Sequence, residues 1–494
     1  MSSTSKKSQS LKEKVVKGTA WTLVGFAAAQ VLRLGSNILL ARLLFAEAFA
    51  LMAIVATVLQ ALAMMSDLGL GPNVIQSKRG DEQKFLDTIW TIQVLRGTAL
   101  AIIASALAWP VSVFYAANDP AAGELLWLIP LVAVGTFVQS FQSTKLKSAN
   151  RHLSMGRITL LQLGSQFTGV VVMVFAAWYT RSVYSMAIGG IVTAIVIVVL
   201  SVVFLPGQNN KFAWEKAATR EIFHFGKWIL LSTVLTFVSL QMDKLVFAKI
   251  FPLADVGVYG IAAGLALVVV MLMGRFQLTI VLPMYSKLMD GKHTIQLVLA
   301  KSKFPILTVG GYMVALLIAC GHSFIELTYD SRYQDAAIYL PIIALGVWFI
   351  IIEGIYATAY LALGNTKWIA IGNFVKIAVF SVLILPAAKT GGIYLAILSG
   401  VLADFLRMMT ALYFSRKLSL PAPSQELIMT VLSVGVGYLC LYGMRIAEGY
   451  MQLNSLGVLA IQFLLVTIVF APMFFRVYRE LKVLAPITDR GSIA

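Results

Sequence analysis

The chain has 494 residues, of which 59% are hydrophobic and only 12% are charged. Soluble globular proteins have roughly 45–50% apolar and about 25% charged residues, so this composition excludes a water-soluble fold. The 39 Lys and Arg residues exceed the 22 Asp and Glu residues and give a net charge of +17. Because the basic residues lie mainly between apolar stretches, they favour a role in membrane orientation, and we expect no nucleic-acid partner.

In chain order, a polar, lysine-rich segment at 1–17 is followed by apolar stretches of about 20 residues, the length at which a helix crosses a bilayer. The short alternating segments of a transmembrane β-barrel do not occur in the sequence. We therefore expect an all-α polytopic membrane protein with about fourteen transmembrane helices. These are predicted at 18–41, 46–68, 88–115, 124–143, 157–179, 183–205, 224–248, 256–284, 304–321, 336–363, 367–386, 391–414, 426–446 and 454–475.

The basic residues between these helices predict the orientation of the chain. With a cytoplasmic N-terminus, 27 of the 39 Lys and Arg residues fall on the cytoplasmic side and six on the opposite side. Since Lys and Arg accumulate in short cytoplasmic loops, we expect both termini in the cytoplasm and an even number of helices. A weak repeat of 21–56 at 228–263 spans six helices, which indicates two halves of equal orientation with a site between them.

Charged residues inside the predicted helices are the strongest functional signal. A charge at the centre of a bilayer costs roughly 3 kcal/mol on insertion scales, so these residues should face protein or water. Salt-bridged structural charges are one interpretation of any single residue. For the group, the excess of cations over deep acids favours an anionic ligand, because the guanidinium fork suits phosphate. The cations are Arg33, Arg96, Lys244, Arg275, Lys376 and Arg407, and the acids are Asp243, Glu353 and Asp404.

Polar side chains recur at helical spacing beside these charges, which means either helix–helix contact or a substrate path, and the charge favours the path. The predicted cavity residues are Gln30, Asn37, Gln162, Gln166, Asn373 and Tyr356. Protonation or cation binding at Asp243, Glu353 or Asp404 could couple transport to an H⁺ or Na⁺ gradient. A structural salt bridge with Lys244 or Arg407 is the alternative for Asp243 and Glu353.

Motifs of enzymes are missing from the sequence. It contains no HExxH, Walker A or GxSxG pattern and no paired-cysteine metal motif. No connection between predicted helices exceeds about twenty residues, which is too short for a folded catalytic domain. We expect no catalytic residue, no metal and no cofactor other than a coupling ion.

Five stretches resemble the Wzx-type polysaccharide flippases of the multidrug/oligosaccharidyl-lipid/polysaccharide exporter superfamily. They are 41–49, 67–76, the basic connection at 145–157, 329–333 and 360–365. Ala46 departs from the family, whose members often have Pro at this position. The likeness covers most of the chain, although each motif is diffuse.

The resemblance implies two six-helix bundles around a central cavity and two additional helices. Here these would be 18–205 and 224–415, joined by a cytoplasmic linker at 206–223, followed by helices in 416–478 and a tail at 479–494. The implied activity is alternating-access export of undecaprenyl-diphosphate-linked oligosaccharide units to the periplasmic leaflet of a bacterial inner membrane. The implied partners are this lipid-linked substrate, membrane lipids, and a polysaccharide polymerase with a chain-length regulator.

Two other functions remain open from the sequence. One is a multidrug antiporter of the same superfamily, whose organic-cation substrates would favour an acidic cavity. The other is a membrane glycosyltransferase or polysaccharide polymerase, which would usually need a large extracytoplasmic loop or a pair of acidic residues near the first such loop. The loop after the first predicted helix, at 42–47, is minimal.

Overall fold

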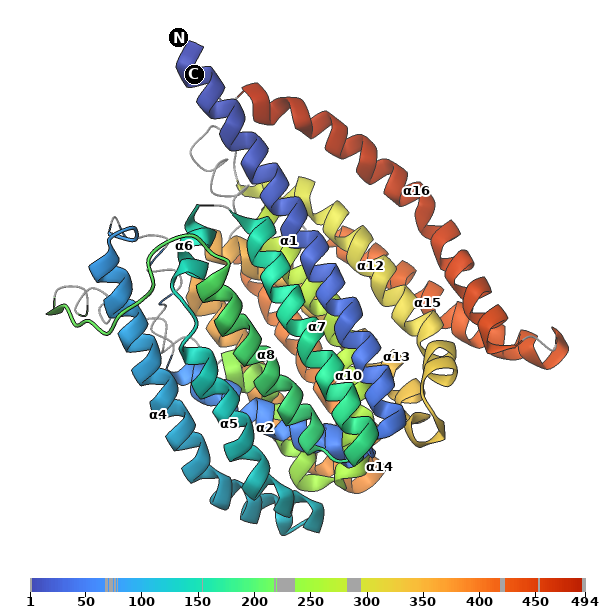
Figure 1. Cartoon of the computed structure of the whole chain (residues 1–494). Helices are drawn as coiled ribbons and strands as arrows, with labels where there is room; N and C mark the ends of the chain where they lie inside the picture. Colours follow the sequence, from blue (N-terminus) through green and yellow to red (C-terminus); the bar gives the residue numbers. More distant parts are fainter. Residues whose placement is uncertain are drawn as a thin grey trace. The chain divides into compact units, whose positions relative to one another are not determined.

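The computed structural model describes residues 2–66, 70, 74, 77, 79–152, 154–216, 219, 236–281, 295–417, 423–451 and 454–490. Every regular element within these ranges is a helix (Figure 1). Twelve of the described helices are long and apolar enough to cross a membrane. The all-α polytopic fold that the composition predicts is therefore confirmed.

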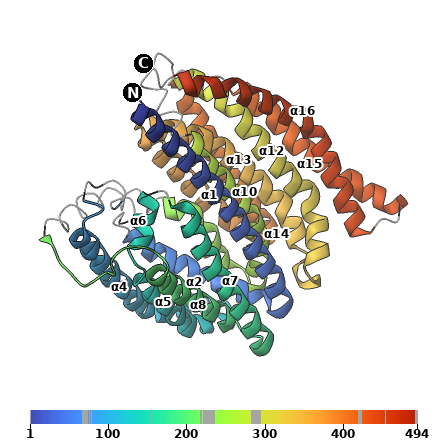
Figure 2. The same ribbon diagram turned by 45° about the horizontal axis from the view of Figure 1, so that its top comes forward.

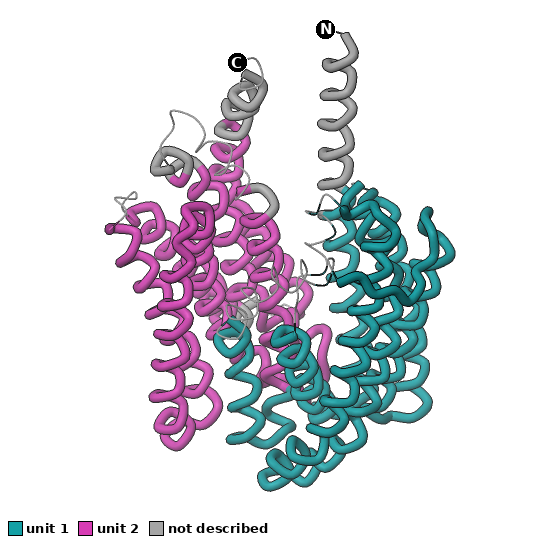
Figure 3. The backbone as a smooth tube through the Cα atoms, turned by 90° about the vertical axis from the view of Figure 1, so that its left-hand side faces the viewer, with its two compact units in different colours: residues 1–257 teal, residues 258–494 magenta. Residues whose placement is uncertain are grey.

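The chain forms two compact units, Met1–Gly257 and Val258–Ala494 (Figure 3). Helical residues 236–250 belong to the first unit because they bond to it: the Tyr115 hydroxyl donates to the Leu245 carbonyl oxygen at 3.2 Å. The Leu253 amide, a few residues later, donates to the Asp119 carboxylate at 3.0 Å. The division thus lies later in the chain than the predicted 206–223 linker, and the bundle limits given above stay a prediction.

Helices of the first unit alternate in direction, as the sequence predicts for consecutive spans. The Gln166 side-chain amide donates to the Ala29 carbonyl oxygen at 3.3 Å and Arg181 donates to that of Leu43 at 3.5 Å, so α1 and α7 run parallel (Figure 1). Between α7 and α8, Gly169 and Gly189 allow close approach, since a Cβ on Gly169 would lie 2.7 Å from the Gly189 carbonyl oxygen. The elements are α1 (Ser2–Leu43), α2 (Ala46–Met65), α4 (Gln83–Ala116), η1 (Pro120–Glu124), α5 (Leu125–Ser140), α6 (Lys145–Arg151), α7 (Met155–Thr180) and α8 (Tyr184–Val203).

The second unit is built around α12, which packs against α13, α15 and α16 (Figure 2). Tyr312 of α12 meets Phe470 and Phe474 of α16 edge to face, with ring centroids 5.7 and 5.2 Å apart. The elements after α10 (Leu253–Phe276) are η2 (Gln277–Val281), α12 (Ile295–Thr328), η3 (Ser331–Tyr333), α13 (Ala336–Ala362), α14 (Thr366–Lys417), α15 (Ser424–Met451) and α16 (Ser455–Arg490).

The 52-residue α14 is a hairpin of two helices rather than one long helix. Its path reverses at Gly391 and Gly392, and Gly392 has φ 60°, a left-handed conformation that favours glycine. The arms then pair in antiparallel register: Trp368 stacks on Phe414 with ring centroids 5.3 Å apart, and residues 376 and 404 face each other. The arms correspond to the separate spans predicted at 367–386 and 391–414.

The direction of α15 relative to α12 supports the same count. Lys303 lies against Glu426 near the start of both helices, and Gly437 lies against Ile318 further along, so the two helices run parallel. Two parallel membrane-spanning helices must be separated in the chain by an odd number of spans. α13 and the two arms of α14 are three such spans. Counting both arms, and the predicted span at 224–248 whose described part is helical, gives the fourteen helices of the prediction.

Candidate functional site

The predicted polar face of α1 lies against α7 in part. One guanidinium nitrogen of Arg33, Nη2, is buried and makes no hydrogen bond within the described residues. Asn37 is half-buried one turn further along, and Gln166 reaches the backbone of α1. Gln30 is buried, whereas the Gln162 side chain is exposed. A half-buried guanidinium with one buried, unused donor is suited to an anion, because an unpaired buried donor costs free energy until an acceptor arrives.

Arg96 lies where α2 and α4 cross. Its side chain donates to the Ser66 hydroxyl at 3.0 Å and to the Ala63 carbonyl oxygen at 2.6 Å. One turn earlier on α4, the Gln93 amide nitrogen donates to the carbonyl oxygens of Ser140 and Gln142 at 2.7 and 2.9 Å. Gln93 thereby joins α4 to the turn after α5.

Lys147 of the short helix α6 completes this cluster and was not predicted as a site residue from the sequence. Its ammonium donates to the Gln93 side-chain oxygen. Loss of water around the ammonium and, secondarily, the positive charge of Arg96 lower the pKa of Lys147 to about 8. Hydropathy places Lys147 in a loop, and the one available signal was the basic run at 145–157.

Two further predicted cations are placed differently. Lys244 is half-buried in the first unit and forms no hydrogen bond or ion pair with another described residue. Asp243 beside it is also half-buried. Arg275 is exposed in the last turn of α10.

Two predicted cations of the second unit form nearly buried ion pairs. Arg407 contacts Glu353 at 2.8 Å, joining the second arm of α14 to α13. Lys376 contacts Asp404 at 2.7 Å, joining the two arms of α14 beside the buried Asn373. The structural salt bridge that the sequence left open for Glu353 is thus present with Arg407, and both cations are offset by a carboxylate.

A third ion pair in this unit was not predicted. Lys303 of α12 contacts Glu426 of α15 at 2.7 Å, and both bond to the Tyr356 hydroxyl of α13, which donates to Glu426 at 2.5 Å. None of the three is more than 2% exposed. Charge counting assigned Lys303 to a connection because hydropathy begins the predicted span at 304, whereas α12 begins at Ile295. Tyr356 therefore faces this ion pair, in a setting that only the packing of three helices creates.

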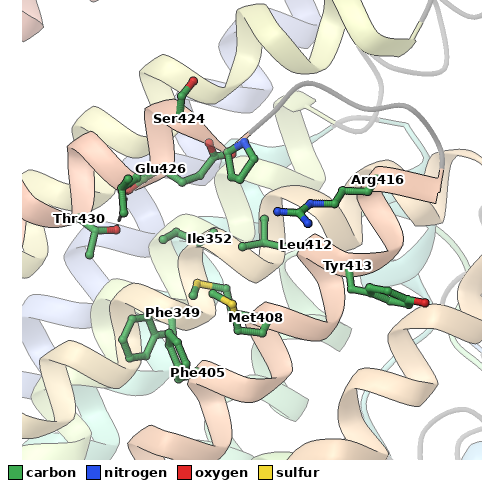
Figure 4. A pocket seen from close by; sticks show the side chains of 13 residues that line it. Phe349, Ile352, Phe405, Met408, Leu412, Tyr413, Arg416, Ser424, Glu426 and Thr430 are labelled. Carbon is green, nitrogen blue, oxygen red and sulfur yellow. Dashed lines mark hydrogen bonds between the residues drawn. The ribbon is translucent and has the colours of Figure 1, made fainter.

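Glu426 also lines a cavity of about 560 Å³ between α13, the second arm of α14 and α15 (Figure 4). Its wall is mostly apolar, with Phe349, Phe405 and Met408 on one side and Arg416 at one end. In the described part of the chain, no group of three or more His, Cys, Asp or Glu side chains is arranged to hold a metal ion.

Comparison with known proteins gives a family and two relatives. A family model described as "Polysaccharide biosynthesis protein" matches residues 39–338. An uncharacterized membrane protein in the cps region of Klebsiella pneumoniae is 21% identical over 381 residues, 75% of this chain and 76% of that protein. Lipopolysaccharide biosynthesis protein WzxC of Escherichia coli (strain K12) is 20% identical over 346 residues, covering 68% of this chain and 67% of that protein.

Solved structures share the fold. Lipid II flippase MurJ in an inward closed conformation has a TM-score of 0.70 at 14% identity, covering 94% of this chain and 99% of that one. An inward-facing multidrug resistance MATE family transporter of the MOP superfamily has a TM-score of 0.61 at 11% identity, covering 79% and 94%. At these identities the likeness concerns the fold alone.

Proposed function

The chain belongs to the polysaccharide biosynthesis protein family, and within it we propose a Wzx-type flippase for an undecaprenyl-diphosphate-linked oligosaccharide. The substrate would move from the cytoplasmic to the periplasmic leaflet by alternating access, in a membrane where both termini of the chain are cytoplasmic. The resemblance to Wzx-type flippases and the transporter fold support this class. The substrate, direction and coupling are our proposals.

The observation that carries the proposal is the setting of the cations in the first unit. Lys147 bonds to the neutral amide of Gln93, and Arg33 keeps a buried donor without an acceptor in the described residues. Arg96 adds a second positive charge close enough to lower the pKa of Lys147. Two like charges held together repel each other, and a diphosphate that bonds to both removes this repulsion. The first unit therefore suits an anion.

The main barrier to moving the substrate across the membrane is the charge of its diphosphate, and a site for this anion would lower that barrier. The diphosphate carries about two charges, and an isolated charge is costly in a low-dielectric medium. Charge-assisted hydrogen bonds from Arg and Lys replace the lost hydration, and the bidentate geometry of Arg holds two phosphate oxygens at once. The apolar tail needs no such site because it remains in lipid.

Ion coupling is proposed for the carboxylates Glu353 and Asp404, with Asp243 as the third candidate. Protonation of Glu353 would remove the charge that holds Arg407 on α13, and protonation of Asp404 would do the same for Lys376. Each event biases the packing of α14, so a proton gradient could favour one state of the carrier. Na⁺ binding at the same oxygens would act in the same direction.

Transport by purified protein in vesicles tests the proposal. Lys147→Gln and Arg33→Gln should each lower transport of a diphosphate-linked glycan lipid about 10- to 100-fold, the size of one lost charged hydrogen bond. Arg157→Gln is the matched control, because Arg157 lies ten residues after Lys147, in the first turn of α7, and is exposed. Transport by the two variants at the level of the control would refute the assignment of these cations.

The same vesicles discriminate the alternatives. An organic-cation antiporter would accumulate a cationic dye and gain from Lys147→Gln, because removing a positive charge favours cations. A glycosyltransferase or polymerase would lengthen the glycan, which gel analysis of the lipid products detects. A proposed polysaccharide polymerase or chain-length regulator partner would be recovered by co-purification from cells that make the polymer.

A further inference from the structure

The cavity in the second unit has the size and the lining of a site for an apolar chain. It lies between α13, the second arm of α14 and α15, and its wall includes Phe349, Ile352, Phe405, Met408 and Leu412 (Figure 4). Its volume of about 560 Å³ corresponds to roughly 19 water-sized groups of about 30 Å³ each. A methylene is about as large as a water molecule, so the cavity matches one long acyl chain.

The mouth of the cavity is exposed and apolar. Met409, Tyr413 and Leu427 line it and are all exposed on the second unit. Since the helices that carry these residues are long and apolar enough to cross a membrane, a chain can enter the mouth from the lipid phase.

The end of the cavity near residue 416 has the features of a membrane–water interface. Trp368 and Phe414 stack with ring centroids 5.3 Å apart, and the Lys417 ammonium lies 5.0 Å from the Tyr413 ring centroid. Aromatic and basic side chains gather at the level of lipid headgroups. The apolar wall of the cavity then lies deeper, at the level of acyl chains.

The polar end of the cavity has a positive charge that no described residue offsets. Arg416 lines this end, is exposed, and forms no hydrogen bond or ion pair with another described residue. The other ionised residue in the lining, Glu426, is already balanced by Lys303 at 2.7 Å.

We propose that this cavity binds an anionic glycerophospholipid, with one acyl chain between α13, α14 and α15 and the phosphate on Arg416. Phosphatidylglycerol, which carries one anionic phosphate, is such a lipid. The bound lipid would tie the N-terminal turn of α15 to the second arm of α14. This site lies in the second unit, apart from the cations to which the proposed function assigns the substrate.

Retention of lipid tests the proposal on the full chain. The protein is placed in nanodiscs of phosphatidylcholine with a minor share of phosphatidylglycerol, and the lipids that remain bound are measured by native mass spectrometry. Arg416→Gln should weaken retention of phosphatidylglycerol about tenfold, the size of a lost charged hydrogen bond. Lys417→Gln is the matched control, because Lys417 is the adjacent cation and does not line the cavity.

A second variant tests the apolar part independently of charge. Met409→Trp enlarges an exposed side chain at the mouth and should lower retention of every phospholipid, with little effect on folding. Equal retention by Arg416→Gln and Lys417→Gln would overturn the phosphate site, and normal retention by Met409→Trp would overturn the chain site. Displacement of the bound phospholipid by the glycan lipid, with matching loss of transport in Arg416→Gln, would show a substrate-tail site and overturn the proposal.

Discussion

The buried ion pair between Lys303 and Glu426 makes a quantitative prediction about stability. Replacing Lys303 by Met keeps the length of the side chain and removes its charge. Glu426 would then lose its counter-charge in a site that is 2% exposed, with the Tyr356 hydroxyl as its remaining donor. The variant also loses the interaction of the ammonium with the Tyr356 ring, whose centroid lies 4.7 Å away.

The expected loss is large because the removed partner leaves an uncompensated charge. Breaking a buried ion pair at one end costs about 3–5 kcal/mol of unfolding free energy. For a unit of this size, that corresponds to a fall in Tm of roughly 6–20 °C. Adding Glu426→Gln to Lys303→Met removes the buried charge. The double variant should therefore lose about 1–3 kcal/mol less unfolding free energy than the sum of the losses of the two single variants.

Thermal unfolding of the four proteins in one detergent measures this cycle. Lys389→Met is the control, because Lys389 is an exposed cation of the same unit, and its loss should stay within about 0.5 kcal/mol. The reasoning would be wrong if Lys303→Met unfolded at the temperature of the control. It would also be wrong if the losses of the single variants were additive in the double variant.

Three further predictions concern other parts of the chain. Because the pKa of Lys147 is about 8, below its ordinary 10.5, binding of a diphosphate ligand should weaken as the pH rises through about 8, and Lys147→Gln should remove this step from a titration. The unfolded chain binds more protons between these two pKa values, so without ligand the free energy of unfolding should rise with pH across that window. Gly392→Ala places a side chain on a residue with positive φ and should lower the free energy of unfolding by about 1 kcal/mol, measured by thermal unfolding. Gly435→Ala is the control: the added methyl group meets open space in α15, so the variant should be as stable as the wild type or more stable. Glu353→Gln should destabilise the second unit by about 3 kcal/mol because Arg407 loses its carboxylate, and equal stability of wild type and variant would contradict the pairing.

Much of the fold could be predicted because lipid imposes a simple pattern on the sequence. Apolar runs long enough to cross a bilayer give the spans, and the break between 386 and 391 anticipates the reversal at Gly391 and Gly392. Helical spacing places Glu353 and Tyr356 on neighbouring positions of one helix, but it does not say which partner each meets. In the structure Glu353 turns to Arg407 on α14, whereas Tyr356 turns to Glu426 on α15.

The rest depends on contacts between distant segments. Lys303 and Glu426 are separated by more than a hundred residues, and each lies at the edge of an apolar run. Hydropathy counts Lys303 with a loop and makes Glu426 the first residue of the predicted span at 426–446. Lys147 is in a connection by hydropathy, yet α6 folds it onto Gln93 of α4. Periodicity predicts which residues share one face of a helix but not which helix packs against that face. The partners of Lys303 and Lys147 therefore cannot be predicted from the sequence of a single segment.

The distribution of charge between the two units decides where an anion is best held. In the second unit, a diphosphate approaching Arg407 or Lys376 would also approach Glu353 or Asp404, and the carboxylates would repel it. Separating either pair to admit the anion would expose an unpaired buried charge at a cost of about 3–5 kcal/mol. In the first unit, Lys147 and Arg33 bring no carboxylate from the described residues, and the anion would stabilise a lysine charge that burial disfavours. Binding there requires no ion pair to break, so we propose that the anion is held in the first unit, while the charges of the second unit hold its helices together.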